Sequence, residues 1–259
     1  MSILKPKSID DVLEAVRHLE DPNQAIKVAV TKLSTIDGVE KVIIEALEQG
    51  ADPTKAPIDN VINPSIIKAI LDNAKVKIPC TTLVYKGIKM GLIDSIINMI
   101  NDGRIDPSNR NSIILVWATG FSADRLVKVL LKHPKVNPRN NIESVVESIC
   151  VSIARGNTKI LKMFLKDNRI DPSELNNRAI RMAAKFGNLG AVKLLLKDSR
   201  VDPSDRDPFT GNYNDALNSA YEEGHTDIVK FLLADPRVKS RVTDMSKYTK
   251  IVKEQWSLE

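Results

Sequence analysis

The sequence predicts an all-α protein, a helical-repeat solenoid closed at each end by a helical cap. The first observation is a recurring phrase that contains Asp or Asn followed by Pro, as in Arg-Ile-Asp-Pro-Ser at residues 104–108. Successive copies place their prolines 31, 34 and 31 positions apart, at Pro107, Pro138, Pro172 and Pro203. A period of this size is typical of stacked supersecondary units. The second observation is that apolar residues recur with helical spacing twice between these phrases, with a glycine between the two runs.

Each unit is therefore predicted to be a helix, a tight turn, a second helix and an extended loop. In the clearest copy we expect a first helix over residues 176–186, a turn at Gly187 and Asn188, and a second helix over residues 189–197. Neither helix could bury its apolar face alone, so the units must stack. The side chains expected to face inward are Ile180, Ala183, Ala184, Val192, Leu195 and Leu196.

The second helices align along the chain in four-residue blocks, and the turn glycines are expected to keep the same register. The blocks end at Ile100, Leu131, Leu165, Leu196 and Leu233. The glycines assigned to the turns are Gly91, Gly120, Gly156, Gly187 and Gly224. Because the helix blocks and the turn glycines recur in the same register, chance does not explain the pattern.

The proline phrase ends each second helix because proline removes a backbone donor and pushes the preceding residue toward an extended conformation. The Asp or Asn before the proline offers a side-chain acceptor to nearby amides. We therefore interpret Asp106, Asp171 and Asp202 as structural residues. The β-branched residues expected to pack beneath the adjoining loop are Ile105, Val136, Ile170 and Val201.

The domain organisation follows from where the repeat is regular. Residues 1–36 are predicted to form an N-terminal cap, in which helices over residues 9–19 and 24–33 pair with each other. Residues 37–238 hold the repeats, and residues 239–259 form a C-terminal cap. Terminal units of a stack are commonly atypical because one of their faces meets water.

Two irregular stretches lie within this plan. The unit around residues 57–74 is shortened, because its second helix follows the preceding one too closely for a full hairpin. In the C-terminal cap we expect a closing helix over residues 245–256. Its side chains Ile251, Val252 and Trp256 would cover the last part of the core.

Residues 43–53, Ile-Ile-Glu-Ala-Leu-Glu-Gln-Gly-Ala-Asp-Pro, resemble the second helix and following loop of an ankyrin repeat, and residues 220–233 carry the Ala, Gly-His and Leu-Leu elements of that family. The resemblance covers residues 37–238 and implies an ankyrin-like solenoid of about six or seven units that binds proteins through its concave face and loop tips. This Val-Asp-Pro-Ser-rich variant resembles repeats of large DNA viruses and protists.

The first helices depart from that family, because its Thr-Pro-Leu-His motif is missing from every copy. The position of the motif's histidine is held by Ile114, Cys150, Arg181 and Asn218. The hydrogen bonds that this motif supplies between neighbouring loops are therefore not expected in their regular form.

Nothing in the sequence indicates catalysis or a cofactor: there is no nucleophile elbow and no glycine-rich phosphate loop. The histidines His18, His133 and His225 are dispersed and form no metal-ligand cluster. Cys80 and Cys150 fit no metal or redox pattern and are expected to be free thiols. No segment has the length and apolarity of a signal peptide or membrane span. We therefore expect a monomeric, cytoplasmic protein that is not an enzyme and holds no metal.

Charge is distributed unevenly along the chain. Residues 1–103 carry 12 Lys and Arg against 14 Asp and Glu, whereas residues 104–259 carry 26 against 19. A basic second half favours an acidic protein partner or a polyanion, although most cations on helical repeats simply keep a face solvated. We predict a non-catalytic protein-binding module. The alternatives are a nucleic-acid or other polyanion binder, which lacks aromatics interleaved for base stacking, and a structural assembly component.

The candidate partner-binding residues come mainly from one helix and one loop. Arg178, Arg181 and Lys185 are spaced by three and four and therefore share one stripe of a first helix. The lengthened loop at residues 205–211 brings in aromatics, and an exposed aromatic can anchor a partner. Alternatively, Phe209 folds back onto its own repeat. The loop candidates are Arg206, Phe209 and Tyr213, and the remaining candidates are Arg110, Arg139 and Arg155.

Overall fold

The computed structural model describes residues 8–75, 82–206, 211, 213–249 and 251. Every regular element in these ranges is an α-helix or a short 3-10 turn, and no strand occurs among them. The all-α prediction is therefore confirmed. The chain divides into two compact units, residues 1–117 and residues 118–259, and each is described by itself.

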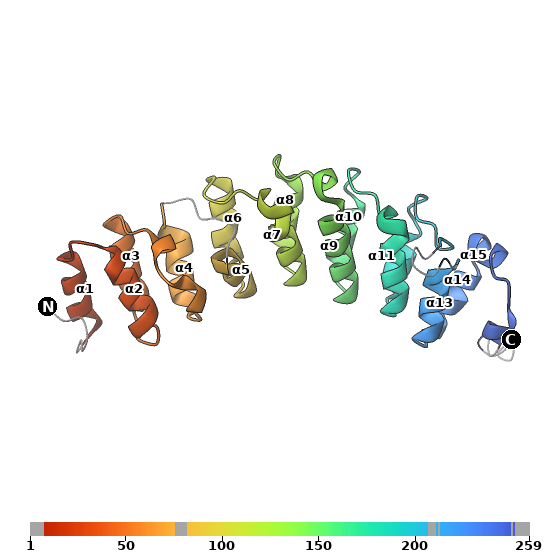
Figure 1. The fold of residues 1–259 in the computed structure, drawn as a ribbon, viewed down its shortest axis with the longest axis horizontal. Helices are drawn as coiled ribbons and strands as arrows, with labels where there is room; N and C mark the ends of the chain where they lie inside the picture. Colours follow the sequence, from red (N-terminus) through yellow and green to blue (C-terminus); the bar gives the residue numbers. More distant parts are fainter. Residues whose placement is uncertain (1–7, 76–81, 207–210, 212, 250, 252–259) are drawn as a thin grey trace. The chain divides into compact units, whose positions relative to one another are not determined.

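The first unit contains α1 (Ile9–Arg17), α2 (Asn23–Lys32), α3 (Val39–Glu48), α4 (Pro64–Asn73), α5 (Thr82–Lys89) and α6 (Ile93–Asn101) (Figure 1). The next helix, α7 (Asn109–Gly120), begins in this unit and ends in the second. Helices α1 and α2 lie where the sequence predicts two helices, and each packs against α3. Helix α3 packs on α4, and α4 packs on α5 and α6.

The shortened unit has no α-helix in front of α4. Two 3-10 turns take its place, η1 (Pro53–Lys55) and η2 (Ile58–Asn60). The Lys86 ammonium of α5 donates to the carbonyl of Val61 at 2.7 Å and also to the carbonyl of Asp59. One side chain from the next hairpin thus satisfies loop carbonyls that would otherwise lack partners within the protein.

The second unit repeats the hairpin more regularly. Its helices are α8 (Asp124–Lys132), α9 (Ile142–Ala154), α10 (Thr158–Leu165), α11 (Glu174–Lys185), α12 (Leu189–Leu195), α13 (Asp215–Glu222), α14 (Thr226–Leu233) and α15 (Pro236–Ser240), with 3-10 turns η3 (Pro138–Asn141) and η4 (Ser246–Tyr248). The first helices α9, α11 and α13 pack on one another in sequence, and the second helices α8, α10, α12 and α14 do the same. This unit is therefore a stack of two helical layers (Figure 1).

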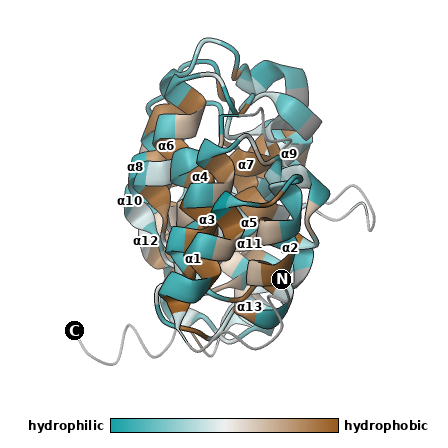
Figure 2. Ribbon diagram, turned by 90° about the vertical axis from the view of Figure 1, so that its left-hand side faces the viewer, coloured by the Kyte–Doolittle hydropathy of each residue, from teal (hydrophilic) through white to brown (hydrophobic). Residues whose placement is uncertain are grey.

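The predicted inward positions of the clearest copy are occupied as expected. Ile180, Ala183, Ala184, Val192 and Leu195 are fully buried. Leu196 is only half-buried, because α12 ends at Leu195 and Leu196 caps it. Figure 2 shows this pattern on the ribbon, where hydrophobic and hydrophilic residues alternate along the same helices. The amphipathic faces meet between the two layers.

The Asp-Pro-Ser loops are local turns. The Asp171 carboxylate accepts hydrogen bonds from the backbone N–H of Ser173 at 2.9 Å and from its hydroxyl at 2.7 Å. Asp106 and Asp202 make the same pair of bonds. The structural interpretation of these aspartates is confirmed. The β-branched residues beside them are also buried as predicted, namely Ile105, Val136, Ile170 and Val201.

Arginines of the same phrase join one repeat to the preceding one. Arg169 is held by Asp167 at 2.6 Å and donates to the carbonyl of Leu131 at 2.5 Å and to that of Val136 at 3.2 Å. Arg104 and Arg237 reach the carbonyls of the preceding repeat in the same way. We call these three residues the arginine anchors. They bond neighbouring repeats where the Thr-Pro-Leu-His motif is absent.

One turn assignment from the sequence is wrong. Gly91, Gly156, Gly187 and Gly224 all follow a first helix by two residues and have positive φ. Gly120 instead is the last residue of α7 and does not have positive φ. The equivalent turn position is Ser122, whose φ of 55° lies in the left-handed region that glycine tolerates best.

The chain end also differs from the expectation. Helix α15 lies at residues 236–240, across the predicted boundary between the repeats and the C-terminal cap. It begins at Pro236, a residue well suited to the first turn of a helix, and the Asp235 carboxylate caps it. Of the closing helix predicted over residues 245–256, the described part shows the turn η4 and helical residues Thr249 and Ile251. Val252 and Trp256 lie outside the described residues.

Candidate functional site

The stripe predicted on α11 is partly used inside the protein. The Arg178 guanidinium forms an ion pair with Glu147 of α9 at 3.3 Å. Arg181 forms one with Asp215 of α13 at 3.2 Å, and its side chain is only 17% exposed. Arg181 also donates to the backbone carbonyls of Leu175 and Asn176. These two arginines therefore tie neighbouring first helices together.

Lys185 and Arg155 are differently placed. Both side chains are exposed and make no ion pair within the described part of the chain. The His225 ring donates a hydrogen bond to the backbone carbonyl of Lys185 at 3.0 Å, and this contact does not involve the Lys185 ammonium. Of the candidates on and near the first helices of the second unit, these two retain their full hydrogen-bonding capacity for a partner.

Cys150 lies beneath this surface. It is 4% exposed, and burial raises the pKa of its thiol to about 11 despite the nearby Arg178 and Arg181. A thiol with such a pKa is neutral at physiological pH and is a poor nucleophile. Cys150 therefore behaves as a small core residue. Cys80 lies outside the described residues.

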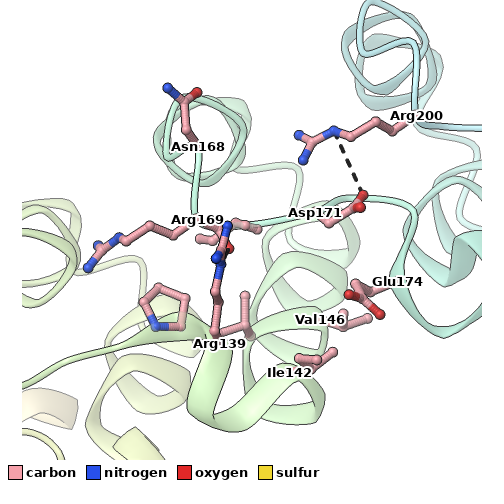
Figure 3. A pocket seen from close by; sticks show the side chains of 11 residues that line it. Arg139, Ile142, Val146, Asn168, Arg169, Asp171, Glu174 and Arg200 are labelled. Atoms are coloured by element: carbon pink, nitrogen blue, oxygen red, sulfur yellow. Dashed lines mark hydrogen bonds and ion pairs between the residues drawn. The ribbon is translucent and has the colours of Figure 1, made fainter.

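A hollow of about 300 Å³ lies between two loop tips of the second unit (Figure 3). One side comes from the start of α9 and the loop before it, and the other from the loop that precedes α11. Ile142, Val145 and Val146 supply its apolar wall. The other lining residues are Pro138, Arg139, Asn168, Arg169, Ile170, Asp171, Glu174 and Arg200.

The three arginines of this hollow differ in how far they are neutralised. Arg169 is an arginine anchor bound to Asp167, and Arg200 is bound to Asp198 at 2.6 Å and lies 3.9 Å from Asp171. Arg139 is exposed and makes one long hydrogen bond, from Nε to the carbonyl of Arg169 at 3.5 Å. Arg139 is thus the cation of the hollow with donors to spare.

A third cluster lies near the lengthened loop. Tyr213 is 51% exposed, and its ring is flanked by Arg241 at 4.8 Å and by Arg206 at 5.9 Å. Arg206 is oriented by a hydrogen bond to the carbonyl of Gly211. Sequence reasoning found Arg206 and Tyr213 but missed Arg241, which lies 28 positions beyond the tyrosine. Phe209 and the side chain of Arg110 lie outside the described residues.

The predicted candidates therefore fall into three groups in the second unit. The first-helix group holds Arg155, Arg178, Arg181 and Lys185, the hollow holds Arg139, and the loop cluster holds Arg206 and Tyr213. Within the described residues, no group of three or more His, Cys, Asp or Glu side chains could hold a metal ion. No helix in those same ranges has the length and apolarity that crossing a membrane requires.

Comparison with known proteins identifies the repeat in the second unit. Residues 148–244 match the family model of ankyrin repeats in three copies. This match begins within α9 and extends through α15. No curated protein and no solved structure matches the chain. Ankyrin repeats are generally protein–protein interaction modules and are typically non-catalytic.

Proposed function

We propose that the chain is a non-catalytic module that binds a protein partner through the loop tips and first helices of its second unit. The observation that carries the proposal is the hollow between the loop tips. It combines an apolar wall with one arginine, Arg139, whose donors are available. An aliphatic side chain next to a carboxylate on a partner would satisfy both features.

The loops around the hollow are held in place before any partner arrives. The Asp171 turn fixes one side, and the Arg169 anchor fixes the same loop to the preceding repeat. Preordering of this kind reduces the conformational entropy lost on binding, so that a modest contact area can give useful affinity. Lys185 and Arg155 extend the surface along the first helices.

The resemblance of the repeat variant extends this proposal. Repeats of this kind resemble those of large DNA viruses and protists, which favours a host-targeting protein that acts in the host cytoplasm.

Affinity capture with matched charge-reversal variants tests the proposed surface. The full chain, the double variant Arg139→Glu/Lys185→Glu and the control Lys27→Glu/Lys41→Glu would be immobilised and exposed to extract of the source cell. Lys27 and Lys41 are exposed residues of the first unit, so both variants change the net charge equally. Proteins on the three supports would be quantified by mass spectrometry.

We expect a protein that the parent chain and the control retain and that the double variant loses. Titration of that protein should show binding at least about tenfold weaker to the double variant, a loss of about 1.4 kcal/mol. If all three supports retain the same proteins to the same extent, the proposed surface is wrong. Far-UV circular dichroism and melting curves would show that each variant is folded.

A further inference from the structure

The second helices of the second unit carry lysines in two rows. The rows lie across α8, α10 and α12, which pack on one another in that order and lie along one side of the ribbon (Figure 2). One row consists of Lys128, Lys162 and Lys193, and the other of Lys132, Lys166 and Lys197. We call these six residues the lysine face. All six side chains are exposed.

The lysine face points away from the core. In α8 the buried residues are Leu126, Val127, Leu130 and Leu131, and the helical period places Lys128 and Lys132 on the opposite side. The same pattern holds in α10 and α12, where Ile160, Leu161 and Phe164, and Ala191, Val192 and Leu195, are buried. Adjacent helices lie roughly 8–10 Å apart, so the lysines form a regular grid.

The charges on this grid are almost unopposed. Helices α8, α10 and α12 contain one carboxylate, Asp124, and it is paired with Lys159 at 2.7 Å. The aspartates that follow Lys166 and Lys197 are paired with arginines, Asp167 with Arg169 and Asp198 with Arg200. None of the six lysines makes an ion pair within the described part of the chain. Lys193 has one interaction of another kind, with its ammonium 5.4 Å from the centre of the Phe231 ring. This differs from the first helices, where Arg178 and Arg181 are paired with carboxylates.

The fold does not require this arrangement, and helix stability explains only part of it. At the aligned positions of the first unit, α3, α4 and α6 carry Ile44, Lys68 and Ile97 in one row and Glu48, Asp72 and Asn101 in the other. The hairpin therefore tolerates apolar, acidic and neutral residues at these positions. A lysine in the last helical turn favours the helix dipole, and this applies to Lys132, Lys162 and Lys193 but not to Lys128.

The grid also has a cost. Helix α8 places Lys128 and Lys132 four residues apart, and like charges at this spacing destabilise a helix by about 0.2–0.5 kcal/mol per pair. An anion bound across the face would relieve this repulsion. Its binding should therefore raise the melting temperature of the protein as well as neutralise the charge.

We infer that the lysine face binds an extended acidic segment of a polypeptide. This inference rests on the proposed function for the class of partner, a protein, but uses a different surface. An extended chain advances about 10 Å in three residues, which matches the spacing of the helices. Carboxylates at every third residue would thus meet successive lysines of one row.

A nucleic acid fits the face less well. Lysines act as point charges, whereas phosphate recognition commonly uses the planar fork of arginine, and the six residues include no arginine. Single strands also require exposed aromatic rings on which bases can stack. The aromatic residues of α10 and α14 do not supply them, because Phe164 is buried and Phe231 is half-buried beside Lys193.

Fluorescence anisotropy with the full chain tests the inference directly. The probes are a labelled poly-glutamate peptide and a labelled DNA duplex of equal total charge. The variants are Lys128→Glu/Lys162→Glu/Lys193→Glu on the face and Lys27→Glu/Lys32→Glu/Lys41→Glu as the control in the first unit, where all three lysines are exposed. Both triple variants have the same net charge, so an effect of net charge alone would weaken binding of the probe to both variants by the same amount.

We expect the parent chain and the control to bind poly-glutamate with affinities that fall steeply as salt rises, and the face variant to bind at least about tenfold more weakly. The triple Lys→Arg variant of the face should bind as the parent does, and the triple Lys→Gln variant should lose binding while retaining its circular dichroism spectrum. Poly-glutamate should raise the melting temperature of the parent chain and not that of the Lys→Gln variant.

Two results would overturn the inference. Equal binding of poly-glutamate by the face variant and the control would show that the grid is no site. Tighter binding of the duplex than of poly-glutamate would make the face a nucleic-acid surface instead. Neither result depends on Arg139 or Lys185, so the proposed loop-tip surface can fail without affecting this test, and the reverse also holds.

Discussion

The two units of the chain use the same hairpin but join its copies in different ways. In the first unit, one repeat has lost its first helix, and Lys86 of the next hairpin bonds to the exposed loop carbonyls instead. In the second unit, every described hairpin from α9 to α14 has both helices, and Arg169 and Arg237 anchor two of its loops, as Arg104 anchors one in the first unit. The match to ankyrin repeats falls within this second region.

This difference shows what a repeat needs in order to remain regular. Apolar packing of the second helices continues through both units, since Ile70 and Leu195, at equivalent positions, are both fully buried. What varies is the polar bonding between loops. In the second unit Asn188 donates to the carbonyl of Ile153 and His225 bonds to that of Lys185, which adds links at the opposite end of the helices from the anchors. The loops are therefore regular in the unit where these hydrogen bonds between repeats recur.

The largest expected effect comes from removing an anchor. Arg169→Ala should lower the free energy of unfolding by about 2 kcal/mol, because charged hydrogen bonds to the carbonyls of Leu131 and Val136 are lost. Lys166→Ala is the control, since Lys166 is exposed three residues before Arg169 and makes no ion pair within the described part of the chain, and it should change stability by less than about 0.5 kcal/mol. Urea unfolding of the two variants measures the difference.

Hydrogen exchange would show where the anchor acts. Protection should fall in α8, α10 and the loop between α10 and α11, while α2 and α3 of the first unit should change little. Equal losses of stability in the Arg169 and Lys166 variants would mean that the anchors contribute nothing beyond ordinary surface contacts. The proposed link between regular loops and polar bonding would then be wrong.

A smaller effect is expected at the turn between α7 and α8. Ser122 occupies the left-handed position that glycine holds in four other hairpins. Ser122→Gly should therefore stabilise the protein by up to about 1 kcal/mol, because a left-handed conformation costs a residue with a side chain roughly that amount. The effect is partly offset by the greater freedom of glycine in the unfolded chain.

Gly156→Ala supplies the opposite test in an equivalent turn. Gly156 has φ 67° and no neighbouring atom lies where its new side chain would go, so strain of the backbone is the only expected penalty. Its melting temperature should fall while that of Ser122→Gly rises. If both variants melt below the parent, the turn at Ser122 is stabilised by something other than its backbone conformation.

The sequence predicted the hairpins well because their apolar period and turn residues are local features. The helix predicted over residues 176–186 illustrates this, since α11 spans residues 174–185 and both Ala183 and Ala184 are fully buried. Its predicted start differs, because residues 175–177 have left-handed backbone angles. Local pattern failed at Gly120, because a glycine near a helix end marks the turn only to within a few residues. There the turn position holds Ser122, which no local rule favours.

The candidate site was less accessible to sequence reasoning. The stripe of Arg178 and Arg181 was visible from spacing, but their partners Glu147 and Asp215 are 31 and 34 positions away and become neighbours only through stacking. The anchors were missed although they have a local signal, an aspartate two residues before the arginine, as in Asp167 and Arg169. In the sequence, that pattern is equally consistent with two solvated surface charges, because the carbonyls of the preceding repeat come close to the arginine only in the folded stack.

The smallest expected effect concerns acid. Four aspartates each accept hydrogen bonds from the arginine two residues later in the chain, namely Asp167, Asp198 and Asp235 in the second unit and Asp102 in the first. These hydrogen bonds lower the pKa of each carboxyl from 3.8. A lowered folded-state pKa contributes stability that is complete above the unfolded-state value and is lost as pH falls through the folded-state value. The second unit, with three such pairs against one, should therefore lose more stability on acidification below about pH 4.

Urea unfolding as a function of pH separates the two units. The triple variant Asp167→Asn/Asp198→Asn/Asp235→Asn should be less stable than the parent at neutral pH, and the gap should narrow as the pH falls below 3.8. Asp102→Asn should show the same convergence with a smaller initial gap. The effect is small because these pairs are partly exposed to solvent, which screens them. A gap that stays constant across this range would mean that the aspartates act through hydrogen-bond geometry alone, without a contribution from their charge.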